Sequence, residues 1–499
     1  MIATADQVEQ FRAWIAQHLG LGFEDAKLGF LAELLHARAR HHHQDPAGYL
    51  TRLARSPGDE IGALAESLTV GETYFFRYAA QFAAFTDVVL PDRMRARGAR
   101  RQLRLLSAGC ASGEEAYSLA IAARSIAPAP TWAVSIRGVD INPAALRRAA
   151  SARFSNWAFR ETPADLQEQW FSRDGRDHIL DEQIRSAVTF ERKNLIVDDP
   201  DLWQPAAYDV IFCRNVLMYF PPDVAERVVA RVESALAPGG YLFLGHAETL
   251  RGLSQQFHLC HTHGTFYYQR RDGAPTPKAW PLDVRRAVPD VAAAVETGDG
   301  WVDAIQRAAE RIRVLVEPPA QATHSAAVVP GPRPDLARIL ELVKHERYDD
   351  ALGLLEGLSP ASGHDVDVLL LRSVALTHAG RCAEAEVACR RLLEIDELHA
   401  GAHYVMALCR EVVGDRKGAA DHDQTAVYLD PMFAMPRLHL GLLARRAGDR
   451  ELARRELAQA LVLFQREDAS RLLLFGGGFH RDALIALCRG ELDGVGTGT

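Results

Sequence analysis

Residues 103–118 read LRLLSAGCASGEEAYS and predict how the middle of the chain folds. The apolar start, from Leu103 to Leu106, indicates a buried parallel strand. A turn of small residues, 107–113, follows, and an apolar helix is expected from Tyr117 onward. A strand, a glycine turn and a helix in this order form the nucleotide pocket of doubly wound α/β folds, because glycine lets a ligand approach the backbone.

The residues around this turn restrict the kind of ligand. The spacing is not G-x-G-x-x-G and no lysine follows the turn, so a pyrophosphate ligand is disfavoured. Glu114 and Glu115 favour a cationic or zwitterionic ligand instead. A second apolar run ends in Asp140, and an acid at the end of the second strand commonly binds ribose hydroxyls. A nucleoside that carries an amino acid and a positive charge describes S-adenosylmethionine, with an NAD-binding unit as the alternative at this stage.

Length and composition set broader limits. A chain of 499 residues suggests two to four domains. The formal charge of −8 argues against a dedicated nucleic-acid binder. Seven scattered cysteines without a CxxC pair indicate reduced thiols in a cytoplasmic protein. No signal peptide and no membrane-spanning run is recognised, so we expect no direct membrane insertion, and any action at a membrane requires recruitment.

The N-terminal region, residues 1–90, is predicted to be a helical domain. Apolar residues recur there at helical spacing, and Asp6 is expected to cap the first helix. Asp45-Pro46 is typical of an N-cap followed by proline at the first helical position. The following stretch, 69–85, has two interpretations: a core aromatic pair beside a solvent-reaching arginine, or a lid over the nucleotide pocket.

Two histidine clusters invite a metal hypothesis, at His41–His43 and between His258 and His263. Adjacent residues on a helix point in different directions, and alternating residues of a strand lie on opposite faces. We therefore predict no metal site.

Residues 91–271 are predicted to form the α/β domain. The run 208–212 is a further strand, and Arg214 and Asn215 follow its carboxyl end, where such sheets bind ligands. An alternating section at about 174–192 predicts a small inserted β-subdomain near the pocket.

The remainder divides into three parts. Residues 272–333 are rich in Pro, Ala and Gly and indicate a linker with one helix, from Trp301 to about Leu315. Residues 334–470 carry a repeat of 34 residues, which is the tetratricopeptide period, and 471–499 are a C-terminal tail. The repeat is marked by the alanines Ala351, Ala385, Ala419 and Ala453 and by the glycines Gly380, Gly414 and Gly448. A helical bundle with an accidental period is the alternative.

Several motifs in register resemble one known family. In order they are LTVGETYFFR, LLSAGCASGEEAYSLAI, VDINPAAL, KNL, YDVIFCRNVLMYF and PGGYLFLGHAE. Together they resemble the CheR-type chemotaxis receptor protein-glutamate O-methyltransferases over roughly residues 1–271. The tetratricopeptide tail resembles a subset of that family. The implied fold is a Rossmann-like S-adenosylmethionine methyltransferase domain with an N-terminal helical domain, a small β-subdomain and a C-terminal all-α repeat domain.

The resemblance also implies a function and site residues. The cofactor would be S-adenosylmethionine, with S-adenosylhomocysteine as product, and the substrates would be glutamates on the cytoplasmic helices of chemoreceptors. A further protein or peptide would bind the repeats, and the protein would be cytoplasmic and recruited to receptor arrays. Arg77 and Tyr219 would border the reaction centre. The implied cofactor-binding residues are Thr73, Arg77, Glu114 or Glu115, Asp140, Asn194, Leu195, Arg214 and Asn215.

One residue departs from the family pattern, because Gly71 stands where an asparagine is expected two residues before Thr73. This puts one cofactor hydrogen bond in doubt. The chemistry otherwise agrees with the residues, since a glutamate carboxylate is ionised at neutral pH and is a nucleophile without a general base. Positioning would supply most of the rate, and a guanidinium such as that of Arg77 matches the two oxygens of the incoming carboxylate.

Two alternatives remain open. The first is an S-adenosylmethionine enzyme with another substrate, although base-amino methylases carry an Asn/Asp-Pro-Pro-aromatic motif where Arg214 and Asn215 stand here. The second is a cofactor-binding scaffold with little or no catalytic activity that acts through its repeats.

Overall fold

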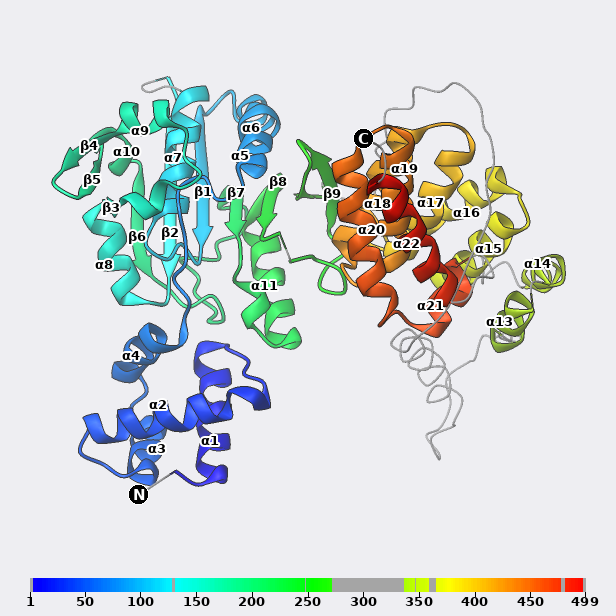
Figure 1. Cartoon of the computed structure of the whole chain (residues 1–499). Helices are drawn as coiled ribbons and strands as arrows, with labels where there is room; N and C mark the ends of the chain where they lie inside the picture. Colours follow the sequence, from blue (N-terminus) through cyan, green and yellow to red (C-terminus); the bar gives the residue numbers. More distant parts are fainter. Residues whose placement is uncertain are drawn as a thin grey trace, which may run out of the picture. The chain divides into compact units, whose positions relative to one another are not determined.

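The computed structural model describes residues 3–127, 131–246, 248–271, 336–345, 347–358, 365–476 and 481–496. The chain divides into two compact units, Met1–Pro275 and Thr276–Thr499 (Figure 1). The linker helix predicted at 301–315 lies outside the described residues.

Four helices form the N-terminal part of the first unit: α1 (Ala5–Leu19), α2 (Leu28–His41), α3 (Pro46–Arg55) and α4 (Gly58–Leu68). They enclose a core to which Phe11, Ile15 and Leu35 contribute fully buried side chains. The expected cap at Asp6 is wrong, because Thr4 caps α1 through a capping box with Gln7.

One residue of the cluster His41–His43, His42, contacts a buried carboxylate of this helical domain. The buried carboxylate of Glu60 accepts hydrogen bonds from Arg38, His42 and Tyr49. Burial alone would raise the pKa of Glu60, but these three donors lower it to about 2. His42 therefore belongs to a structural ion-pair cluster that ties α2 and α3 to α4.

The main sheet of the first unit has the strand order β6-β2-β1-β7-β8-β10-β9. Its strands are β1 (Gln102–Ala108), β2 (Ala133–Asp140), β6 (Val188–Arg192), β7 (Tyr208–Cys213), β8 (Leu236–Leu244), β9 (Phe257–Thr262) and β10 (Thr265–Arg270). The first five in this order are parallel, and β10 pairs antiparallel with both β8 and β9. Because β1 and β7 are buried on both faces, their near-continuous apolar sequences suit a central position.

Helices complete this α/β architecture (Figure 1). They are α5 (Ala79–Ala84), α6 (Leu90–Ala96), α7 (Glu114–Ile126), α8 (Pro143–Ser151) and α11 (Pro222–Ala235), with a π-helical turn, Phe85–Val89, between the first two. The predicted mixed α/β fold is confirmed. The strand order reverses at β1, so the carboxyl ends of β1, β2 and β7 form the edge where a ligand is expected.

The small sheet differs from the predicted range of 174–192. It consists of β3 (Arg153–Ser155), β5 (Asp177–Leu180) and β4 (Phe171–Asp174), so it begins earlier in the chain. The last part of the predicted range forms β6, which pairs with β2 in the main sheet. The short helices α9 (Ala164–Trp170) and α10 (Glu182–Arg185) flank the hairpin of β4 and β5 in the sequence.

The second unit consists of paired helices. The pairs are α13 (Leu336–Lys344) with α14 (Tyr348–Glu356), α15 (Val366–His378) with α16 (Cys382–Ile395), α17 (Ala400–Val412) with α18 (Arg416–Leu429), and α19 (Ala434–Arg446) with α20 (Arg450–Phe464). The four repeat alanines all lie in second helices and are fully buried, and the three repeat glycines have positive φ between the helices of a pair. The predicted tetratricopeptide architecture is confirmed.

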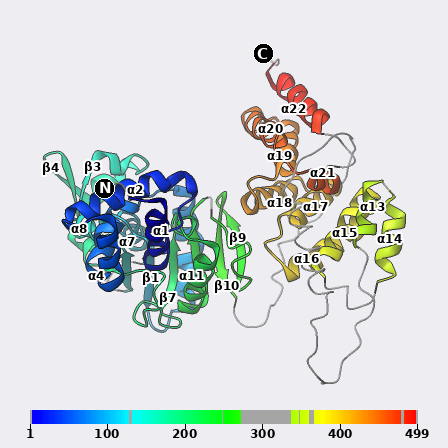
Figure 2. The same cartoon turned by 90° about the horizontal axis from the view of Figure 1, so that it is seen from below.

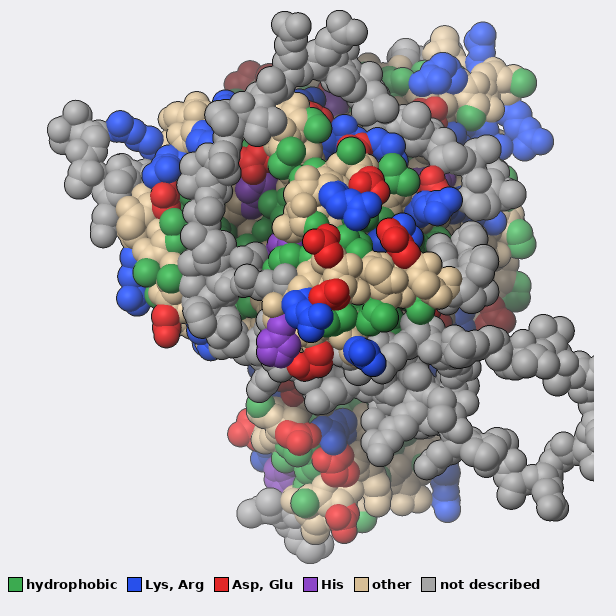
Figure 3. Space-filling model, turned by 90° about the vertical axis from the view of Figure 1, so that its right-hand side faces the viewer, with side chains coloured by type: hydrophobic (Ala, Val, Ile, Leu, Met, Phe, Trp, Pro, Cys, Tyr) green, Lys and Arg blue, Asp and Glu red, His purple; other side chains and the backbone are tan. Residues whose placement is uncertain are grey.

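The segment predicted as a tail is helical where it is described. It contains the end of α21 (Ala469–Phe475) and α22 (Arg481–Gly496), which packs on α20 (Figure 2). None of the helices among the described residues is long and apolar enough to span a membrane. On the face drawn in Figure 3, acidic and basic side chains are interspersed, and helix-surface pairs such as Arg381–Glu384 show the same mixing of sign.

Candidate active site

A cavity of about 200 Å³, open to solvent on one side, lies at the carboxyl ends of β1 and β7. Six of the predicted site residues line it: Thr73, Arg77, Glu115, Arg214, Asn215 and Tyr219. The structure thus brings together residues from three distant segments of the sequence.

The glycine turn after β1 forms one wall of the cavity. Gly109 and Gly113 have φ values of 78° and 94°, which favour glycine. A Cβ on Gly109 would lie 2.4 Å from Cγ2 of Val216, and a Cβ on Gly113 would lie 2.8 Å from Cβ of Ala149. Neither position has room for a side chain, so the turn packs closely against its neighbours, and residues 109–111 of the turn line the cavity.

The two adjacent glutamates that begin α7 have different environments. Glu115 lines the cavity, accepts a hydrogen bond from Ser107 Oγ at 2.7 Å and lies 3.5 Å from Arg214 Nη1. Glu114 is buried and accepts from Ser112 Oγ at 2.8 Å. Burial raises the pKa of both carboxyls, to about 7 for Glu114, while Arg214 opposes the rise for Glu115. The geometry therefore favours Glu115 as the carboxylate that meets a ligand.

Arg214 is a buried cation beside this carboxylate. Its Nη2 donates to the carbonyl of Arg77 at 2.5 Å. Its Nε and Nη1 are buried and have no hydrogen-bond partner among the described residues. Burial lowers the pKa of Arg214 although Glu115 opposes this change. Buried donors without partners are costly, and a bound anionic group would satisfy them.

Glu248, which we did not predict, holds the loop after β7 in place. Its carboxylate accepts hydrogen bonds from the backbone N–H groups of Asn215, Val216, Met218 and Gly245. Asn215 has a positive φ of 58°, and these bonds fix that conformation. The only signal in the sequence was the acid at the end of the motif PGGYLFLGHAE, four residues after β8 ends at Leu244.

The segment 69–85 contains both buried core residues and residues that line the cavity. Phe75 and Phe76 are buried in the core, and Phe76 N–H donates to Ser118 Oγ at 2.9 Å. Arg77, the next residue, lines the cavity. Its Nη1 donates to the carbonyl of Glu72 at 2.9 Å. Phe76 and Tyr78 both have positive φ, which is uncommon for bulky residues and turns Arg77 toward the cavity.

Asp140 lies next to the cavity without lining it. Its two carboxylate oxygens accept from the N–H groups of Asn142 and Ala111, at 2.8 and 2.9 Å. Burial raises the pKa of Asp140, whereas these N–H groups oppose the rise. Ala111 lines the first cavity, and Ile141 lines a second one, so Asp140 stands between the two.

The second cavity lies between the N-terminal helices and the α/β domain. Asn194 lines it, and its Nδ2 donates to the carbonyl of His18 at 2.8 Å. Leu195 is buried and lines neither cavity. Three neighbours of Asn194 also line the second cavity: Lys193, Ile196 and Val197.

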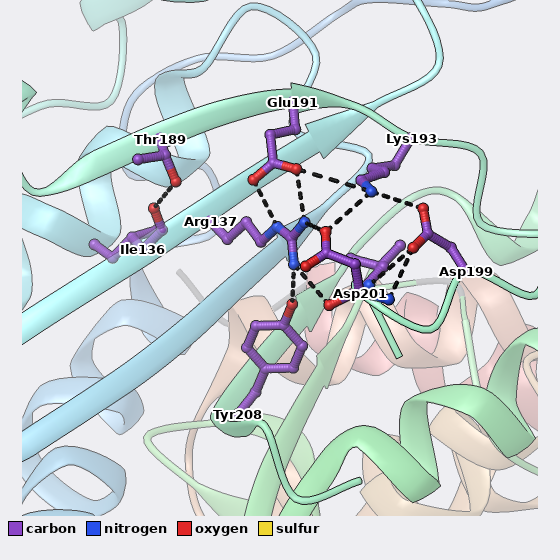
Figure 4. Close-up of polar contacts among 9 residues, drawn as sticks. Ile136, Arg137, Thr189, Glu191, Lys193, Asp199, Asp201 and Tyr208 are labelled. Carbon is purple, nitrogen blue, oxygen red and sulfur yellow. Dashed lines mark hydrogen bonds and ion pairs between the residues drawn. The ribbon is translucent and has the colours of Figure 1, made fainter. Parts of the chain in front are cut away.

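An ion-pair network anchors the segment that carries Asn194 (Figure 4). Arg137 on β2 binds Glu191 on β6 at 2.6 Å and also Asp201. Lys193 binds Asp199 at 2.7 Å and Asp201 at 3.1 Å. Hydrogen bonding to Lys193 lowers the pKa of Asp199, and bonding to Arg137 lowers the pKa of Asp201. These ion pairs therefore attach the segment after β6, which lines the second cavity, to strand β2 of the sheet.

Tyr219 and Met218 lie at the rim of the first cavity, and Tyr219 is 38% exposed. Among the residues that the structure describes, no group of three or more His, Cys, Asp or Glu side chains is placed to hold a metal ion. The site thus combines two arginines, the carboxylate of Glu115, which is paired with Arg214, the backbone of the glycine turn and a rim of Tyr and Met.

Comparisons with known proteins identify the family to which this domain belongs. Residues 71–266 match the family described as CheR methyltransferase, SAM binding domain. The probable biofilm formation methyltransferase WspC of Pseudomonas aeruginosa PAO1 is 30% identical over 426 residues, which cover 83% of this chain and 88% of that protein. The WspC of Pseudomonas putida KT2440 is 29% identical over 90% of this chain and 96% of that protein.

A shorter relative matches the first unit. Chemotaxis protein methyltransferase 2 of Vibrio cholerae is 34% identical over 276 residues, which cover 54% of this chain and 95% of that protein. The matched family domain includes the glycine turn, both arginines and Glu248. The chain belongs to the CheR family of S-adenosylmethionine-dependent methyltransferases of chemotaxis and biofilm pathways.

Proposed function

We propose that the protein transfers a methyl group from S-adenosylmethionine to glutamate side chains on the cytoplasmic helices of chemoreceptor-type proteins. The products are glutamate methyl esters and S-adenosylhomocysteine. The observation that supports this most directly is the pairing of Glu115 with Arg214 inside the cavity while Arg77 and Tyr219 line the same cavity. Glu115 and Arg214 together provide a negative and a positive charge for a zwitterionic ligand. Arg77 provides a second positive charge for a carboxylate substrate.

The residues present fit the cofactor. Glu115 would bind the ammonium of its amino-acid part, and the unpartnered N–H groups of Arg214 would bind the carboxylate. Asp140 would accept the ribose hydroxyls, as an acid at the end of the second strand commonly does. The second cavity, with Asn194, would receive the adenine.

For this reaction the protein mainly has to position the cofactor and the substrate carboxylate. When bound, the cofactor supplies an activated methyl group on a sulfonium. The substrate glutamate is ionised at neutral pH, so no residue has to remove a proton from it. Arg77 would hold the two oxygens of that carboxylate and Tyr219 would shield the site from water. Alignment of this kind can contribute roughly 7–11 kcal/mol to lowering a reaction barrier.

Receptor membranes and methyl-labelled S-adenosylmethionine test the proposal with the full-length protein. Label that mild alkali releases from protein as volatile methanol supports carboxyl methyl esters. Alkali-stable label would show a different nucleophile, and cofactor binding without any labelled protein would favour a scaffold.

A matched pair of variants refines the test. Arg77→Met should lower the rate of ester formation about 100-fold while S-adenosylhomocysteine affinity changes far less, because the guanidinium acts on the substrate carboxylate. Arg153→Met removes an arginine from β3, where Asp174 and Asp177 pair with it, and should leave cofactor affinity and the chemical step unchanged.

A further inference from the structure

The helix α21 leaves the stack of paired helices and crosses the first helices of the repeats. It contacts α13 and α15 directly. Its last residue, Phe475, lies with its ring 5.8 Å from that of Tyr404 on α17 and 5.1 Å from that of Phe433, which precedes α19. The first helices of stacked tetratricopeptide pairs form the concave, peptide-binding surface. We call the surface formed by α13, α15, α17 and α19 the groove.

Apolar side chains fix α21 in the groove. Leu472, Leu474 and Phe475 are 0%, 1% and 4% exposed. Phe475 fills a recess above Gly401, because a Cβ on that glycine would lie 2.7 Å from Cζ of Phe475. Gly401 is the second residue of α17. The recess exists because this position has no side chain, and the ring of Phe475 occupies it.

Polar contacts also fix the orientation of α21 on the groove. Arg471 Nη2 lies 2.6 Å from Asp430 Oδ2, and its guanidinium lies 4.7 Å from the centre of the Phe433 ring. His378 Nε2 lies 2.9 Å from the carbonyl oxygen of Leu474. The arginine and the aromatic residue of α21 thus have specific partners on the repeats, and its two leucines are buried.

The chain returns to the stack after α21. The next helix, α22, packs on α20 and so covers the outer side of the last pair. Glu467, just before α21, accepts from the backbone N–H of Ala434 at 2.6 Å. Residues 469–475 thus lie between two attached segments, and the end of the helical stack is already covered by α22.

We propose that the groove is a binding site for a short helical peptide of a partner protein, and that α21 is its built-in occupant. The partner segment would carry an arginine, an aromatic residue four positions later and leucines between them, as in Arg471–Phe475. Amphipathic helices bind apolar grooves in this way, with a few aromatic anchors contributing most of the affinity. The partner would have to displace α21, which acts at a high effective concentration because it is tethered.

Binding of a labelled peptide tests this proposal. The probe is a fluorescent peptide with the sequence of residues 466–477, and the readout is anisotropy with the full-length protein. Phe475→Ala should empty the recess and increase peptide affinity about tenfold or more over the unsubstituted protein. Val462→Ala, which truncates a 57% exposed side chain on α20, should leave affinity unchanged. A peptide with alanine at the position of Phe475 should not bind.

Two further measurements keep the test decisive. Phe475→Ala combined with Gly401→Leu should lose the gained affinity, because the leucine fills the recess. In the unsubstituted protein, amide hydrogens of α21 should exchange by local opening, faster than those of α17 and α20. Exchange of α21 only through global unfolding would overturn the proposal, as would a Phe475→Ala protein that is folded by circular dichroism and fails to bind the peptide.

Discussion

The concave sites of the two units differ in their lining and in whether the chain itself covers them. In Met1–Pro275 the cavity is lined by charged groups, and two buried N–H donors of Arg214 have no hydrogen-bond partner there. In Thr276–Thr499 the groove is apolar and is covered by α21 of the same chain. A charged cavity needs a ligand of matching charge to satisfy its donors, whereas an apolar groove can be covered by any segment of suitable shape. The first arrangement selects a ligand, and the second regulates access to one.

The largest effect is expected from the charged cavity, at Glu115. Glu115→Gln should weaken S-adenosylhomocysteine binding about 100-fold or more in calorimetry, because the ligand ammonium loses its carboxylate and Arg214 loses its anionic partner. Glu114→Gln is the matched control and should change affinity less than about threefold, since Glu114 does not line the cavity. Equal losses from both variants would contradict the assignment of Glu115.

The second prediction concerns a buried ion cluster of the repeat unit. His439 lies 2.6 Å from Asp423 and 2.9 Å from Glu411. Burial alone would lower the pKa of His439, but the two carboxylates raise it to about 10. A raised pKa means that this stabilisation is full below pH 6.5 and is lost as the pH rises through 10.

Urea unfolding at pH 7 and pH 10, followed by circular dichroism, measures this loss. The unfolding free energy of the repeat helices should fall by roughly 3–4 kcal/mol between the two pH values. The double variant His439→Gln, Asp423→Asn should show a smaller fall, because it carries no titrating pair. An equal fall in both proteins would assign the effect to other groups.

The third prediction tests the covered groove through glycine. Gly401→Ala should destabilise the repeat unit by about 1–2 kcal/mol, because the new methyl meets Phe475 at 2.7 Å. Gly353→Ala on α14 is the control, since nothing lies within 4 Å of its Cβ, and it should stabilise by about 0.5–1 kcal/mol. Thermal melting distinguishes the opposite signs, and stabilisation by both variants would show that the recess is not tightly filled.

The smallest effect is expected at Gly71. A Cβ there would meet only Arg148 Nη2, at 3.7 Å, so a larger side chain fits. Gly71→Asn restores the residue expected in the family and should strengthen cofactor binding about two- to fivefold through one additional hydrogen bond. Gly71→Ala should leave affinity unchanged. Weaker binding by the asparagine variant would show that the glycine is required.

Local patterns predicted the parts of the site that are contiguous in sequence. Strand, glycine turn and helix at 103–118 appeared as expected, because hydrophobic periodicity and glycine are strong local signals. Such patterns could not choose between Glu114 and Glu115, since adjacent residues share the same local pattern and differ only in what the rest of the fold places beside them. The roles of the predicted residues toward the cofactor stay predictions.

Long-range pairing was the part that the sequence did not predict. The segment that forms β6 was assigned to the small sheet, because alternation indicates a strand but not the sheet it joins. Glu248 and the loop that contains Asn215 are far apart in sequence and meet only after β7 and β8 pair. The apolar run of α21 is too short for periodicity to indicate a partner, so it was placed in a tail.

The Glu248 carboxylate has a consequence for synthesis of the protein. Since it fixes the loop that carries Asn215, the cofactor cavity cannot be complete until residue 248 has left the ribosome. The remaining unit, Thr276–Thr499, then takes roughly 10–45 s to be translated at about 5–20 residues per second. A nascent chain can therefore acquire its cofactor before α21 exists, and we expect ligand binding to precede closure of the groove in the life of each molecule.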